Sequence, residues 1–376
     1  MNDSISFLAY SDIHHHEYKD GINGDDVEAV EEEAYQLLLQ HQVDFWLFLG
    51  DRFVSRNPLD ITRQRADRAL KRKSDLGIPG ILLSGNHDYW FKNAHNGHSM
   101  SHINLYNSDL KHLTVIDTVR TQVVPSKHGT PIAIHAIPAE HEIPKFTFDK
   151  SIPWNICIFH GMIIGSTFEN KTPVKDGISH HMIDYPEFDL VLGGDNHKHQ
   201  KLPLKNTTGY YIGAPMQHNW GDVGSPRGFC LITLSRTPIK QIQVCHILSH
   251  APQFLIHHTR INEIEDLIKL ITINRSKWKD NLVQLHLSGT SKSLDGIIPH
   301  DWENKIKEET RARVVRIRLD FDIQLTTSIK PERRTEADEW RDYLVLQGPV
   351  LAKGLDLEKL ENLGLGYINN AATPLL

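Results

Sequence analysis

The sequence predicts an α/β fold whose chemistry lies at the carboxyl ends of buried strands. Short runs rich in Ile, Leu, Val and Phe alternate with amphipathic stretches in the first part of the chain, as strands and helices do. A short polar motif follows each of five such runs, which span residues 5–10, 45–49, 81–83, 156–159 and 190–192. Because α/β sheets carry their functional residues at the carboxyl ends of strands, these motifs are expected to meet in one site.

The five motifs keep a fixed order and contain residue types that bind metal ions. They are Asp12-Ile13-His14, Gly50-Asp51, Gly85-Asn86-His87-Asp88, His160-Gly161 and His197-Lys198-His199. Each motif alone is common in solvated turns, so the prediction depends on their joint occurrence. Asp51 is the natural bridging ligand, because one carboxylate can face two cations. An imidazole binds one cation through one ring nitrogen and leaves the other nitrogen for a hydrogen-bond partner. Together the motifs predict a site for two ions.

A helix is predicted between the first two motifs. The acidic side chains of residues 25–33 would form its solvated face. Its buried stripe consists of apolar residues at helical spacing, which are Val27, Val30, Ala34, Leu37 and Leu38.

Two shifts in composition divide the chain into three parts. Residues 1–249 form the first domain, in which a polar turn at 235–240 separates the last two strands. Residues 250–325 form a smaller α/β unit, with strands at 253–257, 282–287 and 313–319 and helices at 261–273 and 302–309. Residues 326–376 are a polar linker and an apolar tail, which either packs on the parent domain or docks onto a partner.

The composition indicates a globular cytoplasmic protein that does not associate with membranes. Of its 376 residues, 39% are hydrophobic and 23% are charged, which excludes a disordered chain. We expect no signal peptide at residues 1–8, and no apolar run approaches the length of a membrane span. The three cysteines, Cys157, Cys230 and Cys245, are dispersed and fit a reducing compartment, where we expect them in the core.

The order of the motifs resembles that of the calcineurin-like metallophosphoesterases, and in particular the Mre11/SbcD-type nuclease subunits. A second signal is Tyr211-Ile212-Gly213-Ala214-Pro215, followed by Gly221-Asp222 and Arg227-Gly228-Phe229, which is similar to a segment of those nucleases. The resemblance covers residues 4–234 well and the remainder loosely. It implies a two-sheet metallophosphoesterase sandwich flanked by helices, followed by a capping domain that channels DNA towards the metals.

The resemblance also implies roles for individual residues. One ion would be held by Asp12, His14, Asp51 and His199, and the other by Asp51, Asn86, His160 and His197. His87 would neutralise charge on the phosphate and protonate the departing oxygen, and Asp88 would orient His87. Two divalent ions are implied; Mn is preferred by resemblance, and the nitrogen and oxygen ligands also suit Fe, Zn or Mg.

Two departures from the family pattern concern the site. Asn196 precedes His197, where a Gly-His-x-His motif is usual. Arg52 follows the Gly-Asp motif, where it either contacts a phosphate or is a surface side chain. Two basic stretches, at 63–73 and 305–318, either track a DNA backbone or cover protein surface.

The function predicted from the sequence is cleavage of DNA, as exonuclease or endonuclease, by a two-metal phosphodiesterase. By resemblance, the protein would be the nuclease subunit of an Mre11–Rad50/SbcCD-like complex. Its partners would be DNA, a Rad50/SbcC-like ATPase bound by the tail, and a second copy in a homodimer. The alternatives are a small-molecule phosphodiesterase or phosphatase of the same superfamily and a non-catalytic DNA-binding scaffold subunit.

Overall fold

The computed structural model describes residues 4–89, 110–236, 239–322, 340, 341, 344 and 357–371. The chain divides into two compact units, Met1–Phe321 and Asp322–Leu376. The predicted linker at 326–336 and much of the predicted tail lie outside the described residues.

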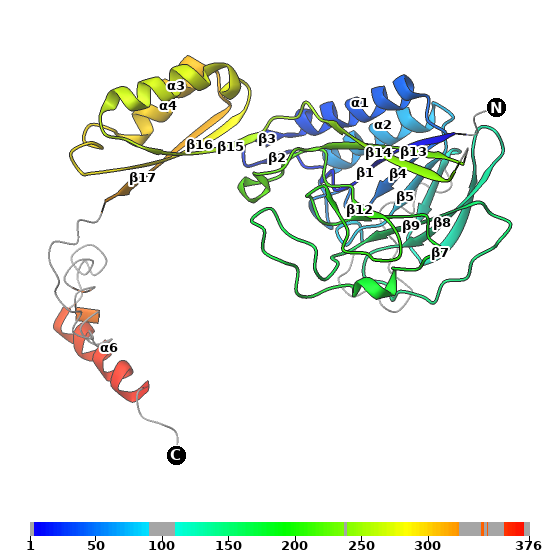
Figure 1. Ribbon diagram of the computed structural model, residues 1–376. Helices are drawn as coiled ribbons and strands as arrows, with labels where there is room; N and C mark the ends of the chain where they lie inside the picture. The colour runs from blue at the N-terminus through cyan, green and yellow to red at the C-terminus, as the bar shows by residue number, and fades with distance from the viewer. Residues whose placement is uncertain are drawn as a thin grey trace. The chain divides into compact units, whose positions relative to one another are not determined.

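The first part of unit 1 is a sandwich of two sheets (Figure 1). The first sheet has the order β14-β13-β1-β4-β5-β6. These strands are Gln241–Leu248, Gly228–Ser235, Ile5–Tyr10, Phe45–Leu49, Gly80–Leu83 and Leu113–Ile116. The second sheet has the order β11-β12-β10-β9-β8-β7. Its strands are Gln200–Lys201, Gly209–Tyr211, Leu190–Gly194, Trp154–His160, Pro131–Ile137 and Arg120–Pro125. This two-sheet α/β architecture confirms the predicted fold class.

The central strands are mainly apolar because both of their faces are buried. In β1, Phe7 and Ala9 pack in the core between the two sheets, whereas Leu8 and Tyr10 face the helices. Helices α1 (Gly24–His41) and α2 (Asp60–Ser74) cover that outer face of the first sheet (Figure 1). The five strand positions expected from the apolar runs are therefore confirmed.

Helix α1 begins where the sequence provides a cap. The Asn23 side chain accepts a hydrogen bond from the Asp26 amide, and the Asp26 side chain accepts one from the Asn23 amide. A short hairpin of β2 (Tyr18–Lys19) and β3 (Ile22–Asn23) precedes the helix.

The acidic run on α1 and the basic stretch on α2 pair with each other. Arg65 and Arg68 contact Glu28, at 3.0 and 2.8 Å. Beneath them Lys73 is fully buried and forms an ion pair with Glu31, which also lies 2.9 Å from His15. The acidic face is thus only partly solvated, and these members of the 63–73 stretch are engaged by protein carboxylates.

The part of the chain predicted to be a capping domain is a three-stranded parallel sheet covered on one face by two helices (Figure 1). The strands are β15 (Phe254–Arg260), β16 (Leu282–Gly289) and β17 (Val314–Phe321), and the helices are α3 (Ile264–Trp278) and α4 (Pro299–Thr310). Each predicted element of residues 250–325 is present with shifted ends. The unit has its own apolar core. Phe254 connects it to the sandwich, because the Phe254 amide donates a hydrogen bond to Gln217 Oε1 at 2.6 Å.

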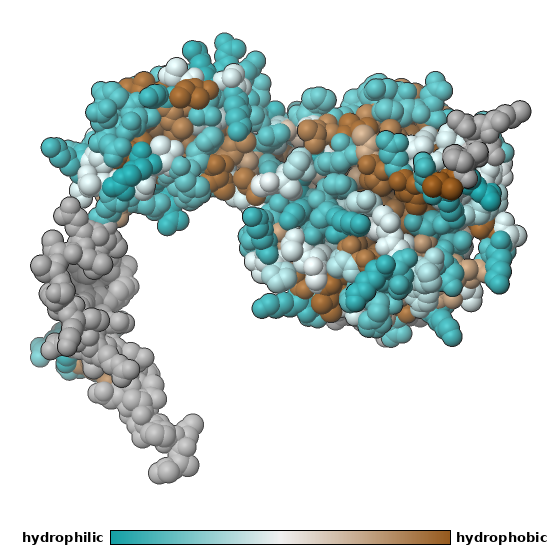
Figure 2. All heavy atoms as spheres, in the orientation of Figure 1, coloured by the Kyte–Doolittle hydropathy of each residue, from teal (hydrophilic) through white to brown (hydrophobic). Residues whose placement is uncertain are grey.

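Hydrophilic side chains cover most of the visible face of unit 1, and apolar atoms form smaller patches (Figure 2).

In unit 2, helix α6 (Leu357–Ala371) forms an ion pair with the segment before it, between Glu361 and Arg341 at 3.0 Å. Among the described residues, no helix is both long and apolar enough to cross a membrane.

Cys157 and Cys230 are buried as expected, but Cys245 is exposed because it lies on the edge strand β14.

Candidate metal centre

The loops that follow β1 and β4 place their acidic residues by unusual backbone conformations. Asp12, His14 and Asp51 have φ values of 54°, 50° and 57°, in the left-handed region that non-glycine residues rarely adopt. Hydrogen bonds join the two loops, from the Asp12 amide to Gly50 O at 2.9 Å and from the His14 amide to Asp51 O at 3.1 Å. Such strain is typical of functional sites, where the surrounding structure holds it.

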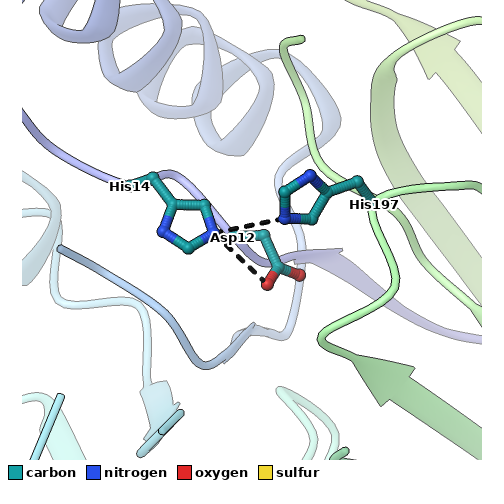
Figure 3. A group of neighbouring side chains, drawn as sticks. All are labelled: Asp12, His14 and His197. Atoms are coloured by element: carbon teal, nitrogen blue, oxygen red, sulfur yellow. Dashed lines mark hydrogen bonds and ion pairs between the residues drawn. The ribbon is translucent and has the colours of Figure 1, made fainter. Parts of the chain in front are cut away.

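Asp12, His14 and His197 point towards one another (Figure 3). His14 Nε2 lies 3.2 Å from His197 Nε2 and 3.9 Å from Asp12 Oδ1. Asp12 Oδ1 is buried and forms no hydrogen bond. A buried carboxylate oxygen without a donor, facing two imidazole nitrogens, is suited to a cation.

Asp51 lies between this group and a second one. Its Oδ2 is 3.7 Å from His14 Nε2, and its Oδ1 is 3.4 Å from His160 Nε2. The same His160 nitrogen is 3.2 Å from Asn86 Oδ1. The two oxygens of Asp51 therefore face different imidazoles, which is the arrangement expected of a bridging carboxylate.

Each histidine at the centre is oriented through its other ring nitrogen. Nδ1 of His14 lies 3.3 Å from Phe53 O, and Nδ1 of His160 lies 2.6 Å from Leu49 O. His197 Nδ1 lies 3.2 Å from the Asp222 carboxylate. These contacts leave Nε2 of all three rings directed at the centre, as in metal sites whose ligands are held by outer hydrogen bonds.

Burial and neighbouring charges together set the protonation of the site. It lowers the pKa of His14 to about 3, so this imidazole is neutral and able to bind a cation at neutral pH. Burial also raises the pKa of Asp12 to about 6. For Asp51, burial is outweighed by the neighbouring His160, and the pKa of the carboxyl falls below its ordinary range. The donor set of carboxylates, an amide and imidazoles fits divalent ions such as Mn, Fe, Zn or Mg.

The last motif reaches the centre through residues nearer to β10 than expected. His197 lies beside Asp12 and His14, where the sequence had suggested His199. Asp195 lies beside His160, with Oδ1 3.8 Å from His160 Nε2, and its amide donates to Asp12 Oδ2 at 3.1 Å. Burial raises the pKa of Asp195.

His199 is directed away from this centre. Its ring stacks on His246 at 4.3 Å, and its Nδ1 lies 3.6 Å from Cys230 Sγ. His199 is directed away because β10 ends at Gly194, so residues 195–197 form the loop at the centre, whereas His199 already adjoins β11. The groups of described residues that could hold a metal ion include neither His199 nor Asp195, and one of them combines His87 with His14 and Asp51. The sequence signal for Asp195 is its place shortly after the apolar run 190–192, where functional residues of an α/β sheet gather.

Asp88 and Arg52 have other roles than those expected. The fully buried Asp88 carboxylate accepts hydrogen bonds from the amides of Asp51 at 3.0 Å, Arg52 at 2.9 Å and Gly85 at 2.8 Å. It holds the backbone of the two loops together and does not orient the His87 ring. The Arg52 side chain is also buried, and its Nη2 pairs with Asp67 at 3.4 Å, so it is not presented to a phosphate.

His87 lies at the open side of the centre. Its side chain is 37% exposed, and its Nε2 is 3.9 Å from Asp51 Oδ2. Its Nδ1 lies 2.8 Å from Val54 O. The ring is therefore oriented by this carbonyl and not by Asp88, as the sequence had suggested. His87 is therefore the histidine of this cluster that is most accessible to a substrate.

The segment after β12 supplies supporting residues that the motifs did not reveal. Asp222 accepts from the His218 amide at 2.7 Å in addition to its contact with His197. His218 Nε2 lies 2.7 Å from Asp12 O. Arg227 donates to His197 O and to Asp222 O. Gly213 (φ 75°) passes so close to the last motif that a Cβ there would lie 2.7 Å from the His199 amide. The segment after the last motif therefore supports both the ring and the backbone of His197.

Comparison with known proteins identifies the family. The model of the calcineurin-like phosphoesterase family matches residues 5–199, more than half of the chain. A purple acid phosphatase from yellow lupin (Lupinus luteus) seeds is 12% identical with a TM-score of 0.41; the match covers 62% of this chain and 50% of that one, so the chain spans half the length of the lupin enzyme. A dimetal phosphatase from Danio rerio is 10% identical with a TM-score of 0.41, over 64% of this chain and 98% of that one. Among curated proteins no match was found. The chain belongs to the calcineurin-like phosphoesterase family.

Proposed function

We propose that this protein is a two-metal phosphodiesterase that cleaves DNA. The observation that carries the proposal is the position of Asp51, whose two oxygens face the His14 and His160 imidazoles. One ion would be held by Asp12, His14, Asp51 and His197, and the other by Asp51, Asn86, His160 and Asp195. Such a pair of ions, about 3.5–4 Å apart, activates a water and stabilises the attacking and leaving oxygens of a phosphoryl displacement.

His87 is the proposed general acid. Its Nδ1 is held by Val54 O, and the ring is partly exposed beside the bridging carboxylate. Nε2, which lies 3.9 Å from Asp51 Oδ2, would neutralise charge on the phosphate and deliver a proton to the departing oxygen. A non-catalytic scaffold would have no need of a histidine held in this way.

DNA is favoured over a small phosphoester by the face of the capping sheet that lies opposite α3 and α4. Strand register aligns His258, His286 and Arg318 in one row across the three strands. Arg316 lies two residues before Arg318 on the same face, opposite the core that contacts α3 and α4. The Arg316 guanidinium stacks over Trp220 at 5.6 Å, two residues before Asp222, which orients His197. A polar row with basic side chains therefore begins at Trp220, which is close to Asp222 along the chain, and Asp20 and Asp320 pair with its two arginines.

The runner-up function is hydrolysis of a small phosphodiester or phosphomonoester. It is favoured by a cavity of about 210 Å³ next to Asp195 and His197, which is too small for a nucleic-acid strand. By resemblance, we also propose a Rad50/SbcC-like ATPase as a partner of the C-terminal unit and self-association through the catalytic domains.

A nuclease assay with charge-reversed variants tests the proposal. The full chain with Mn²⁺ is expected to cleave single- or double-stranded DNA with a higher kcat/KM than bis(p-nitrophenyl) phosphate. In R316E/R318E the ratio of these two kcat/KM values should fall, and the salt dependence of DNA cleavage should weaken by about one unit of slope per lost phosphate contact.

The matched control is K305E/K307E, which makes the same charge change on exposed positions of α4. Its ratio should stay closer to that of the unaltered chain. Hydrolysis of small esters without cleavage of DNA would replace the nuclease proposal by the runner-up.

A further inference from the structure

A small cavity opens directly beside the metal centre. Its volume is about 210 Å³, just below the range of pockets for drug-sized ligands. Asp195 and His197 line one side, and Phe168, Glu169 and Lys198 line another. A group bound there would adjoin a phosphate held at the metals.

Phe168 is an apolar side chain that remains 42% exposed on a firmly held loop. On one side of it, the Thr167 amide donates to Gln200 Oε1 at 3.0 Å, and Gln200 Nε2 donates to Thr167 O at 2.7 Å. On the other side, Glu169 forms an ion pair with Arg227 at 2.7 Å. The ring is thus kept at the rim of the cavity, whereas a mobile loop could turn it into the core.

The cavity is lined by the basic side chain of Lys198 and by the carboxyl groups of Glu169, Asp195 and Asp222. Arg227 lies 2.7 Å from Glu169 and 3.6 Å from Asp222, so both carboxylates are compensated. Lys198 Nζ donates to Thr167 Oγ1 at 3.1 Å, which engages one of the three donors of an ammonium group. The remaining donors suit a phosphate oxygen.

An aromatic face combined with a cation next to a phosphodiesterase centre defines a chemical class of ligand. Nucleobases stack on aromatic side chains irrespective of their identity, and a lysine complements the adjoining phosphate. We propose that this cavity is a nucleoside subsite. Phe168 stacks on the base of the nucleotide that carries the scissile phosphate, and Lys198 contacts the phosphate of the same nucleotide. The inference rests on the proposed phosphodiesterase function and adds the recognition of one nucleoside to it.

Two chromogenic substrates separate this subsite from the reaction itself. The p-nitrophenyl ester of thymidine 5′-phosphate carries a base, whereas methyl p-nitrophenyl phosphate carries none, and both release p-nitrophenol. With Mn²⁺, the unaltered chain should prefer the thymidine ester. In Phe168→Ala the ratio of the two kcat/KM values should fall about tenfold, which corresponds to about 1.4 kcal/mol and lies within the range for base–aromatic stacking.

Two further variants keep the test decisive. Phe168→Tyr retains the aromatic face and should preserve the ratio. Ile164→Ala removes another exposed apolar side chain from the same loop, one that does not line the cavity, and should also preserve it. An unchanged ratio in Phe168→Ala, or an equal loss on both esters, would overturn the subsite. Absence of hydrolysis of both esters by the unaltered chain would instead overturn the phosphodiesterase function, and the subsite with it.

Discussion

The variant Asp51→Asn is expected to lose phosphodiester cleavage and to bind both metal ions more weakly. Each Asp51 oxygen faces one half of the centre, at 3.7 Å from His14 Nε2 and 3.4 Å from His160 Nε2. An amide has one oxygen and no charge, so it cannot bridge two cations. Because metal ions contribute several kcal/mol of transition-state stabilisation, and each 1.36 kcal/mol is tenfold in rate, turnover should fall by at least about 10³-fold. Metal content after dialysis and turnover with Mn²⁺ measure the two effects.

Asp60→Asn is the matched control for this loss. It makes the same chemical change on helix α2, where the Asp60 side chain is 90% exposed. This control should keep full metal content and normal turnover. If Asp51→Asn also retained two ions and normal turnover, Asp51 would not belong to the metal site.

The variant His87→Ala should separate the chemical step from metal binding. The partly exposed His87 ring is held by Val54 O and is not among the ligands that we propose. Its removal should leave metal occupancy near normal and lower the rate by about 10²–10⁴-fold, the usual contribution of one general acid. The rate with a p-nitrophenyl ester should fall less than the rate with DNA, because p-nitrophenolate leaves without a proton.

His112→Ala provides the control for His87, since the His112 side chain is exposed just before β6. It should alter neither metal content nor rate. A His87→Ala protein that lost an ion would show that His87 is a ligand, and the assignment of a general acid would then fail.

The strands that position the centre could be predicted from the sequence because their residues are buried on both faces. Strands such as β1 and β4 are therefore continuous apolar runs. The motifs after them could be placed at one edge of each sheet because each motif follows the carboxyl end of a strand. The predicted helix was also marked by its apolar stripe, which packs against the outer face of the first sheet.

The ligands of the last motif could not be derived from the strand pattern alone. The apolar run suggested that the strand ends at Leu192, but β10 continues through Gly193 to Gly194. Two residues of added strand shift the loop, so that Asp195 and His197 reach the centre while His199 stacks on His246. Because the sequence has two histidines, His197 and His199, at the spacing of a ligand pair, both were predicted to bind metal.

The directions of side chains and the ion pairs between distant residues could not be predicted from the sequence either. Asp88 stands next to His87 along the chain, yet its carboxylate is directed at the amides of Asp51 and Arg52. Arg68 lies in a stretch that could have tracked DNA, but Glu28 of the preceding helix pairs with it at 2.8 Å. Such partners are set by how helices pack, which local patterns do not encode.

The most direct test of the two-ion centre is a crystal structure of the full chain with Mn²⁺, in which anomalous scattering locates the ions. We predict two peaks about 3.5–4 Å apart, bridged by Asp51, with His197 at the first ion and Asp195 at the second. A single peak, or a second ion bound by His199 with Asp195 unengaged, would contradict this account.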